Sequence, residues 1–301
     1  MTTHGPLRLH AVYVALDEPA LFRASIASVY DHVERIVVVT THDRDWRGIA
    51  REPSAIVASV LSRDVDPQRK IDLIVTSETS EARARNRAMD YAAPRPSSRR
   101  VRREHDADAS YVPPDYFLIV DCDEVYASDD LERLKAFVAA RRRPLYRTAC
   151  VRYFKRWNFR IHGYEWAVTF VRADQRLPYL RMRRPPLVRR ALAKVPGAGQ
   201  AVRDRLLGYV DIPAAVGVFH HGSYVGPRRR IEQKIESFGH ADEVAPRWME
   251  QVYDRWTPSA TDFNPAFPGL FAGADAVALE DLPPEIRAFP WPPEYLEAGR
   301  P

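Results

Sequence analysis

The stretch YFLIVDCDEVY, residues 116–126, combines a strongly apolar run with three carboxylates. Its residues 117–120 have the pattern of a strand that is buried on both faces, as in the middle of a parallel sheet. Asp121, Asp123 and Glu124 follow directly at the carboxyl end of that strand. Like charges held this close repel one another, and burial strengthens the repulsion. The stretch therefore predicts a positively charged partner at this strand end.

Strand and helix patterns alternate through the first half of the chain. Strands are expected at 7–16, 35–40, 71–76 and 116–120, and helices between them at 19–30, 53–64 and 80–92. This alternation predicts an α/β fold with a mainly parallel central sheet, right-handed crossovers and flanking helices. Ligands of such sheets bind beyond the carboxyl ends of the strands, where the three carboxylates lie.

The second half changes character after the acidic strand end. Residues 129–144 predict a helix, with Asp129 and Glu132 in the spacing of a capping box. The aromatic, β-prone segment 145–180 favours antiparallel strands beside the parallel ones, which makes the sheet mixed. Pro227 is well placed to begin another helix. The predicted organisation is one large domain at 1–243, with halves at 7–126 and 127–243, and an extension at 244–301 packed on it.

Composition and charge limit the cellular compartments and the binding partners that the sequence allows. The 301-residue chain is 46% hydrophobic and has two cysteines, which allows a packed core and is too few for a disulfide framework. The chain shows neither a signal-peptide pattern nor an apolar run near the roughly 20 residues of a membrane span, so a cytoplasmic protein is predicted. The net charge of +5 is concentrated in arginine clusters within 93–114, an expected surface loop, and within 181–205. The second cluster could contact an anionic membrane surface.

Three interpretations of the acidic strand end compete. Carboxylates in a D-x-D spacing suit Mg²⁺ or Mn²⁺, which can hold substrate phosphates at the same time. A carboxylate pair can also perform general acid–base or nucleophilic chemistry. In the third interpretation, Asp121 and Asp123 only cap loops and helices. Their position after a buried strand in an alternating β/α pattern favours the metal site.

Four segments follow one another along the chain: HAVYVALDEPALFRASIASVYDHVERIVVVTTHD, EARARNRAMDYA, YFLIVDCDEVY and HHGSYVGPRRRIEQKIESFGHADE. In this order they resemble the successive motifs of inverting GT-A glycosyltransferases. The similarity is to the broad family-2-like group and to bacterial relatives of a β-1,4-N-acetylglucosaminyltransferase group. It touches most of residues 9–243 and none of 244–301.

This resemblance implies a donor site for a nucleoside-diphosphate sugar, with UDP favoured. Asp121 would contact the ribose or a metal-bound water, and Asp123 would ligate Mn²⁺ or Mg²⁺ between the two phosphates. The same resemblance implies that the remaining contacts to the nucleotide come from Asp17, Asp43, Arg85 and Asn86. The sequence departs from the family pattern at Asp17–Glu18 and at TTHDRDW (40–46), both in the region of the base.

The histidine pair before the last helix offers further ligands. His221 is preferred over His220 as a third metal ligand, and Arg228 or Lys234 could contact phosphate. An inverting transfer also needs a base for the acceptor hydroxyl. Glu165 is the first candidate, because Tyr164 and Trp166 beside it could stack on a sugar, and Asp174 is the reserve.

Two other classes of function stay open from the sequence. A nucleotidyltransferase could use a similar sheet, although it would normally have a glycine-rich basic loop after the first strand, where ALDEPALF has no glycine. A non-catalytic module could bind nucleic acid or an anionic surface through the arginine clusters, but aromatic platforms interleaved with base-reading groups are not evident. The acceptor could be a carbohydrate, a lipid-linked sugar or a small molecule.

Overall fold

The computed structural model describes residues 6–16, 19–45, 48–50, 52–93, 112–177, 208–237 and 240–296. Its strands are β1 (Leu9–Val14), β2 (Arg35–Thr41), β3 (Ile71–Thr76), β4 (Tyr116–Asp121), β5 (Glu124–Tyr126), β6 (Leu145–Ile161), β7 (Glu165–Arg172), β8 (Val210–Asp211), β9 (Val218–Val225) and β10 (Ala274–Ala276). The α-helices are α1 (Pro19–Val29), α2 (Pro53–Val60), α3 (Glu81–Ala92), α5 (Ser128–Arg141), α8 (Arg228–Ser237) and α9 (Pro284–Arg287). Single turns of other helix types occur at η1 (Tyr30–His32), η2 (Ala241–Glu243), η3 (Met249–Tyr253) and η4 (Leu279–Asp281).

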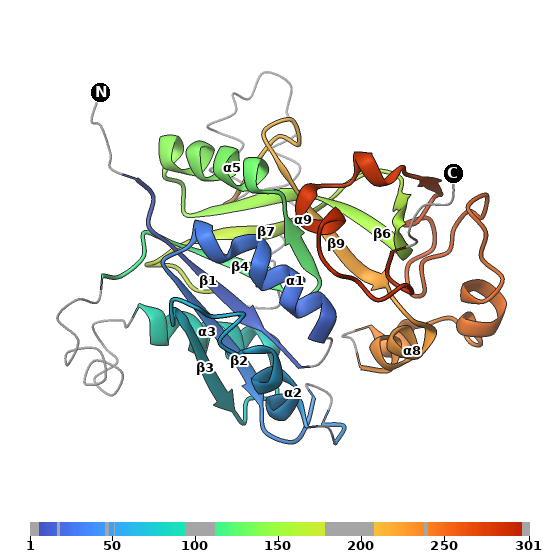
Figure 1. Ribbon diagram of the computed structural model, residues 1–301, viewed down its shortest axis with the longest axis horizontal. Coiled ribbons are helices and arrows are strands. Elements are labelled where there is room, and N and C mark those ends of the chain that lie inside the picture. The colour runs from blue at the N-terminus through green and yellow to red at the C-terminus, as the bar shows by residue number, and fades with distance from the viewer. Residues whose placement is uncertain are drawn as a thin grey trace.

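Within the described residues, all ten strands belong to one mixed sheet (Figure 1). The order is β3-β2-β1-β4-β7-β6-β9-β5, and β8 and β10 both pair with β6. The first four strands are parallel, and β7 then joins β4 in the antiparallel direction. The predicted mixed α/β fold with a parallel core and flanking helices is confirmed.

The parallel half is a three-layer arrangement because its strands are apolar on both sides. Odd-numbered residues of β1, such as Leu9 and Tyr13, pack with α1, α2 and α5 in one core. Even-numbered residues, such as Val12 and Val14, pack against α3 in a second core on the opposite face. All six residues of β1 are buried, as expected for a central parallel strand. Of the helices predicted here, the one at 53–64 is shorter in the structure and ends at Val60.

The sheet curves back on itself at its far edge. Asp121 ends β4 and Glu124 begins β5, so the two residues are at most about 11 Å apart along the chain. Nevertheless β5 pairs with β9, which is separated from β4 by β7 and β6 in the sheet order. The intervening strands must therefore bend until β9 lies beside the end of β4. The backbone N–H of Gly222 in β9 donates to the Asp123 carbonyl at 2.7 Å.

Helix α5 begins differently from the expected capping box. Ala127 is its N-cap residue and no side chain caps the helix there. Asp130 instead accepts the backbone N–H of Val218 at 3.1 Å, and Glu132 pairs with His32 and Lys135. The acidic first turn thus ties α5 to β9 and η1, and the capping-box prediction was wrong.

The C-terminal residues add an aromatic layer over the far half of the sheet. Phe154 of β6 is surrounded by the rings of Trp248, Tyr253, Trp256, Phe263 and Phe271. Residues of this segment therefore pack on β6, while the division at 243 into a domain and an extension stays a prediction. No described helix has the length and apolar character needed to cross a membrane.

Candidate functional site

The two aspartates at the end of β4 face different cations. Arg85 of α3 is buried and donates from its guanidinium to Asp121 Oδ1. The same guanidinium bonds Glu81 one helical turn earlier, with Nε 3.1 Å from Glu81 Oε1. Arg85 therefore neutralises a carboxylate of its own helix and a carboxylate of the sheet.

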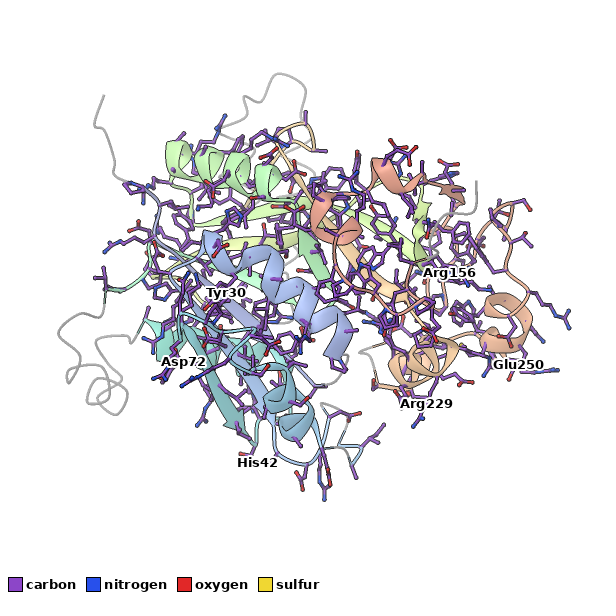
Figure 2. The ribbon with its side chains drawn as sticks, viewed as in Figure 1. Tyr30, His42, Asp72, Arg156, Arg229 and Glu250 are labelled. Atoms are coloured by element: carbon purple, nitrogen blue, oxygen red, sulfur yellow. The ribbon has the colours of Figure 1, made fainter. Side chains whose placement is uncertain are left out.

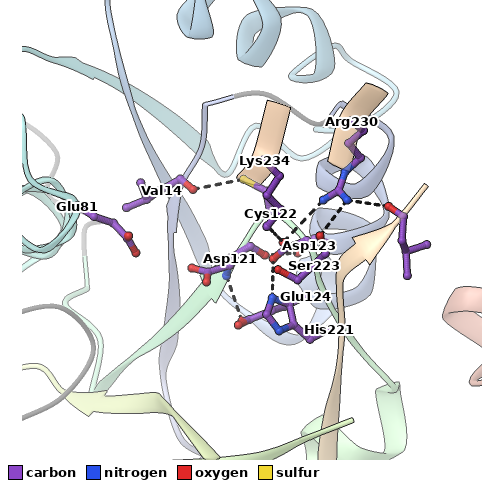
Figure 3. Close-up of polar contacts among 12 residues, drawn as sticks. Val14, Glu81, Asp121, Cys122, Asp123, Glu124, His221, Ser223, Arg230 and Lys234 are labelled. Carbon is purple, nitrogen blue, oxygen red and sulfur yellow. Dashed lines mark hydrogen bonds and ion pairs between the residues drawn. The ribbon is translucent and has the colours of Figure 1, made fainter. Parts of the chain in front are cut away.

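Asp123 is surrounded by positive and hydrogen-bonding groups from β9 and α8 (Figure 3). Lys234 Nζ lies 2.5 Å from Asp123 Oδ2, and His221 Nε2 lies 3.1 Å from Oδ1. The guanidinium of Arg230 is 3.9 Å from Oδ2. Burial alone would raise the pKa of Asp123, but the charges of Lys234 and His221 and the hydrogen bond to His221 hold it well below its usual range. Asp123 is therefore a buried carboxylate that stays ionised.

Glu124 completes the acidic strand end. Its Oε2 accepts the backbone N–H of Asp121 at 3.1 Å (Figure 3). Burial, followed by the charge of Asp123, raises the pKa of Glu124 well above its usual value. Two neighbouring carboxylates thus have pKa values shifted in opposite directions, which is typical of sites that bind or move charge.

The geometry of β9 and α8 brings their side chains to Asp123. Gly222 lies against the indole of Trp157, where a Cβ would come within 2.8 Å of the ring. Gly226 forms the turn into α8 with φ +114°, a conformation that disfavours other residues. Arg230 then donates to the carbonyls of Ser223 and Val225 at 3.0 and 2.7 Å, which ties α8 back to the strand. In contrast its neighbour Arg229 is exposed (Figure 2).

Glu165 begins β7 on the same side of the sheet. Its side chain is 54% exposed, and Oε2 lies 3.5 Å from NH1 of the buried Arg152 in β6. Arg152 is paired in register with His221, and His221 with Glu124, so these residues form one row across the strands. The predicted base Glu165 therefore lies beside an arginine that shares a row with His221 and Glu124.

Tyr224 connects the two parts of this region. Burial raises its pKa, which is also affected by the charges of Lys234, Glu165 and Asp123. Through its contact with Arg152, Glu165 is linked to the cluster formed by Asp121, Asp123, Glu124, Arg85, His221, Arg230 and Lys234, which we call the edge cluster.

The histidine that precedes His221 faces the other way. His220 is buried, and its Nδ1 lies 2.8 Å from the hydroxyl of Tyr153. Burial lowers the pKa of His220 to about 3. Of the two histidines, His221 is the one beside Asp123, and its role as a metal ligand stays a prediction.

Other predicted site residues lie outside the edge cluster. Asn86 uses its amide on the backbone of Leu177, donating at 2.6 Å and accepting at 2.9 Å. Arg228 pairs with Asp254 and Glu232 on the outer side of α8. Asp17 is not among the described residues, nor are most of 93–114 and the segment 181–205.

Two further predicted carboxylates follow other strands of the sheet. Asp43 is exposed after β2, next to His42 (Figure 2). Asp174 follows β7 near the amino end of β4, because Arg172 pairs with Tyr116 there. Its hydrogen bonds to Arg172 lower the pKa of Asp174, which weakens it as a base. The structure therefore favours Glu165 over the reserve candidate.

A divalent cation does not fit these side chains as they are folded. Oxygen ligands must approach Mg²⁺ to about 2.1 Å in a nearly octahedral shell, whereas an ammonium group lies against Asp123 and a guanidinium against Asp121. Over the described ranges, no three His, Cys, Asp or Glu side chains are arranged to hold a metal ion. The metal ligands Asp121, Asp123 and His221 stay a prediction that would require Lys234 to move.

Arg152 and Arg230 also belong to this region and were not predicted from the sequence. Arg152 is a buried charged residue among the apolar residues of β6. Because burying a charge is costly, a charged residue in such a strand indicates a functional site. Arg230 stands in a run of three arginines, where only the helical periodicity relative to the buried Ile231 marks it as facing inward.

Comparisons with known proteins give no family assignment. No family model and no curated protein matches the chain. Among solved structures, it is similar to S. aureus TarS over 50% of its length, with 13% identity and a TM-score of 0.30. It is also similar to S. aureus TarS 1–349 over 76% of its length, with 9% identity and a TM-score of 0.37. The chain covers 22% and 64% of those two chains.

Proposed function

We propose that the protein is a GT-A type glycosyltransferase. It would transfer a sugar from a nucleoside-diphosphate sugar, with UDP favoured, to an acceptor hydroxyl with inversion. The observation that carries the proposal is the edge cluster, in which buried cations and carboxylates meet beyond the carboxyl end of a central parallel strand. Sheets of this kind bind their ligands there. The order of the four resembling segments supports the same function.

The cations of the edge cluster suit a diphosphate leaving group. Arg85 is anchored by Glu81 and Asp121, and Lys234 and Arg230 are anchored by Asp123. Positive groups held in place before the reaction stabilise charge that develops in the transition state without having to reorganise. The sequence also predicts Mn²⁺ or Mg²⁺ at this place, and no step described here depends on that ion.

Glu165 is placed to accept the proton of the acceptor. The bond between the anomeric carbon and the diphosphate oxygen breaks, and its electron pair leaves with the diphosphate. The acceptor oxygen forms the new bond to the anomeric carbon from the opposite face, and its proton passes to Glu165. Arg152 orients the carboxylate, and the ring of Tyr164, which is 51% exposed, could stack on the acceptor sugar.

Binding of nucleoside diphosphates tests the donor part of this proposal. Thermal unfolding would be followed with UDP, GDP, dTDP and CDP in buffer containing both Mn²⁺ and Mg²⁺. At 100 times its Kd, the correct diphosphate should add about 2.7 kcal/mol to the free energy of unfolding. Asp121→Asn should reduce this gain. Asp211→Asn is the control and should keep it, because Asp211 of β8 is exposed and pairs with Arg147 of β6. Stabilisation by none of the four would contradict the proposed donor class.

A further inference from the structure

Lys234 lies where the sequence predicts a divalent cation. Its ammonium group is 2.5 Å from Asp123 Oδ2, and His221 Nε2 is 3.1 Å from the other oxygen. The side chain of Asp123 is 5% exposed, whereas that of Lys234 is 19% exposed. The ammonium is therefore the more accessible member of this pair, and it lies between the buried carboxylate and a ligand arriving from solvent.

Helix α8, which carries Lys234, is fixed to β9 and holds the lysine in this position. Arg230, one helical turn earlier in α8, bonds the carbonyls of Ser223 and Val225 in β9. Arg230 and Lys234 are four residues apart and so share one face of the helix. Both approach Asp123 from that face (Figure 3). Lys234 and a second cation, Arg230, are thus both held next to Asp123 by the same helix.

The charges of the cluster are already matched by side chains. Arg85 is paired with Asp121, and Lys234 and Arg230 are paired with Asp123. A doubly charged ion at Asp123 would be placed against an ammonium and a guanidinium group, and like charges at close range repel strongly in a partly buried site. A diphosphate, in contrast, brings the negative charge that such cations attract.

We propose that Lys234 takes the place of the divalent cation and binds the diphosphate of the donor directly. This inference rests on the function proposed above. When the glycosidic bond to the diphosphate breaks, the electron pair stays on the leaving oxygen, and the ammonium group stabilises that charge while keeping its own proton. Asp123 holds the ammonium in place, so it is a positioning residue for Lys234 and contacts no metal.

Calorimetric titration tests this assignment. The full chain would be titrated with UDP, GDP, dTDP and CDP, once with excess EDTA and once with Mn²⁺. The same diphosphate should bind in both buffers, with Kd values within about three-fold. Lys234→Met should weaken its binding about ten-fold or more in EDTA, the usual effect of losing a hydrogen bond to a charged group. Lys135→Met serves as the control, because Lys135 pairs with Glu132 on the surface of α5 and should leave Kd unchanged.

Lys234→Arg distinguishes the loss of the diphosphate contact from a folding defect caused by Lys234→Met. It keeps the positive charge at Asp123, so its diphosphate affinity in EDTA should lie between those of the wild type and Lys234→Met. Binding that requires Mn²⁺ would overturn the assignment of Lys234 and leave the proposed function standing. Binding of none of the diphosphates in either buffer would overturn both.

Discussion

Arg85 connects two elements through ion pairs that centre on its buried guanidinium. Arg85 belongs to α3 and its side chain is buried, and it has one carboxylate partner in its own helix and one in β4. A guanidinium suits this position because it stays charged and can serve several acceptors in one plane. Removing it would leave the partly buried carboxylates of Asp121 and Glu81 without this cation.

We therefore predict that Arg85→Met destabilises the fold markedly. Removing Arg85 takes a charged hydrogen-bond partner from Asp121 and Glu81, and because both carboxylates are partly exposed the expected cost is about 1–3 kcal/mol in the free energy of unfolding. Urea denaturation would measure this loss. Arg87→Met is the matched control, since Arg87 is exposed on the same helix and should change stability by less than about 0.5 kcal/mol. Equal stability of the two variants would show that the Arg85 pairs contribute nothing.

His220 makes a separate prediction about pH. Its pKa is about 3 in the folded chain and about 6.5 when unfolded, because burial disfavours the charged ring. Below pH 6.5 the unfolded chain binds the extra proton, so stability falls as the pH decreases toward 3. Between pH 7.5 and pH 5 this loss amounts to about 2 kcal/mol, and His220→Gln should lack it. Urea titrations of both proteins at the two pH values would measure the difference, and parallel losses would contradict the buried neutral ring.

At the residue scale, the sequence predicted that positive charge must lie at the acidic strand end, but it did not predict which side chains supply that charge. Three carboxylates after a buried strand required positive charge, whereas Arg85 was predicted only as a contact to the nucleotide. Lys234 was considered only as a phosphate contact, since its ion pair with Asp123 joins residues 111 positions apart. Asn86, Arg228 and Asp43 have the right residue types for nucleotide contacts. Their orientation depends on neighbours such as Leu177 and Asp254 that no local pattern reveals.

At the scale of elements, β9 and α8 form the unit that carries the cations. Strand β9 supplies His221 and the tight turn at Gly226 directs α8 back toward Asp123. The helix itself was predictable from Pro227 and the apolar spacing of Ile231 and Ile235. Its inward face was predictable too, because Lys234 lies between Arg230 and Ile231 around the helix axis.

The turn into α8 is expected to tolerate no side chain. A Cβ on Gly226 would lie 2.7 Å from the ring of Tyr295, at φ +114°. Gly226→Ala should therefore cost about 3 kcal/mol, the sum of backbone strain and overpacking. Gly269→Ala is the control, because Gly269 also has a positive φ but has open space around it, and it should cost about 1 kcal/mol. Chemical denaturation compares the two, and similar costs would mean that Tyr295 gives way.

At the scale of the whole molecule, the alternation of strands and helices determined the parallel half. Four apolar runs became the parallel strands and the predicted helices became their two covering layers. The curvature that returns β9 to the end of β4 could not be predicted. It follows from the pairing of β5 with β9, a contact between residues about a hundred positions apart. The edge cluster depends on that curvature, which is why its full membership emerged only from the structure.

The C-terminal aromatic layer should belong to the same cooperative unit. Phe263 is buried in the ring cluster around Phe154, so Phe263→Ala should remove about 3 kcal/mol or more from the free energy of unfolding. The loss should appear in one transition, seen alike by far-UV circular dichroism and by tryptophan fluorescence. Phe267→Ala, at a ring that is 36% exposed, should have a much smaller effect. Two separate transitions would show instead that the extension unfolds independently of the sheet.

Turnover of nucleotide sugars tests the central claim most directly. Purified full-length chain would be incubated with UDP-, GDP-, dTDP- and CDP-sugars, and release of the nucleoside diphosphate would be measured. The account predicts release from one donor class, slow with water as acceptor, and a reduction of about 100-fold or more in Glu165→Gln. Glu232→Gln, which alters a pair with Arg228 outside the edge cluster, should keep the wild-type rate. Pyrophosphate formation from a nucleoside triphosphate and a sugar phosphate, with no diphosphate released from any donor, would contradict the account.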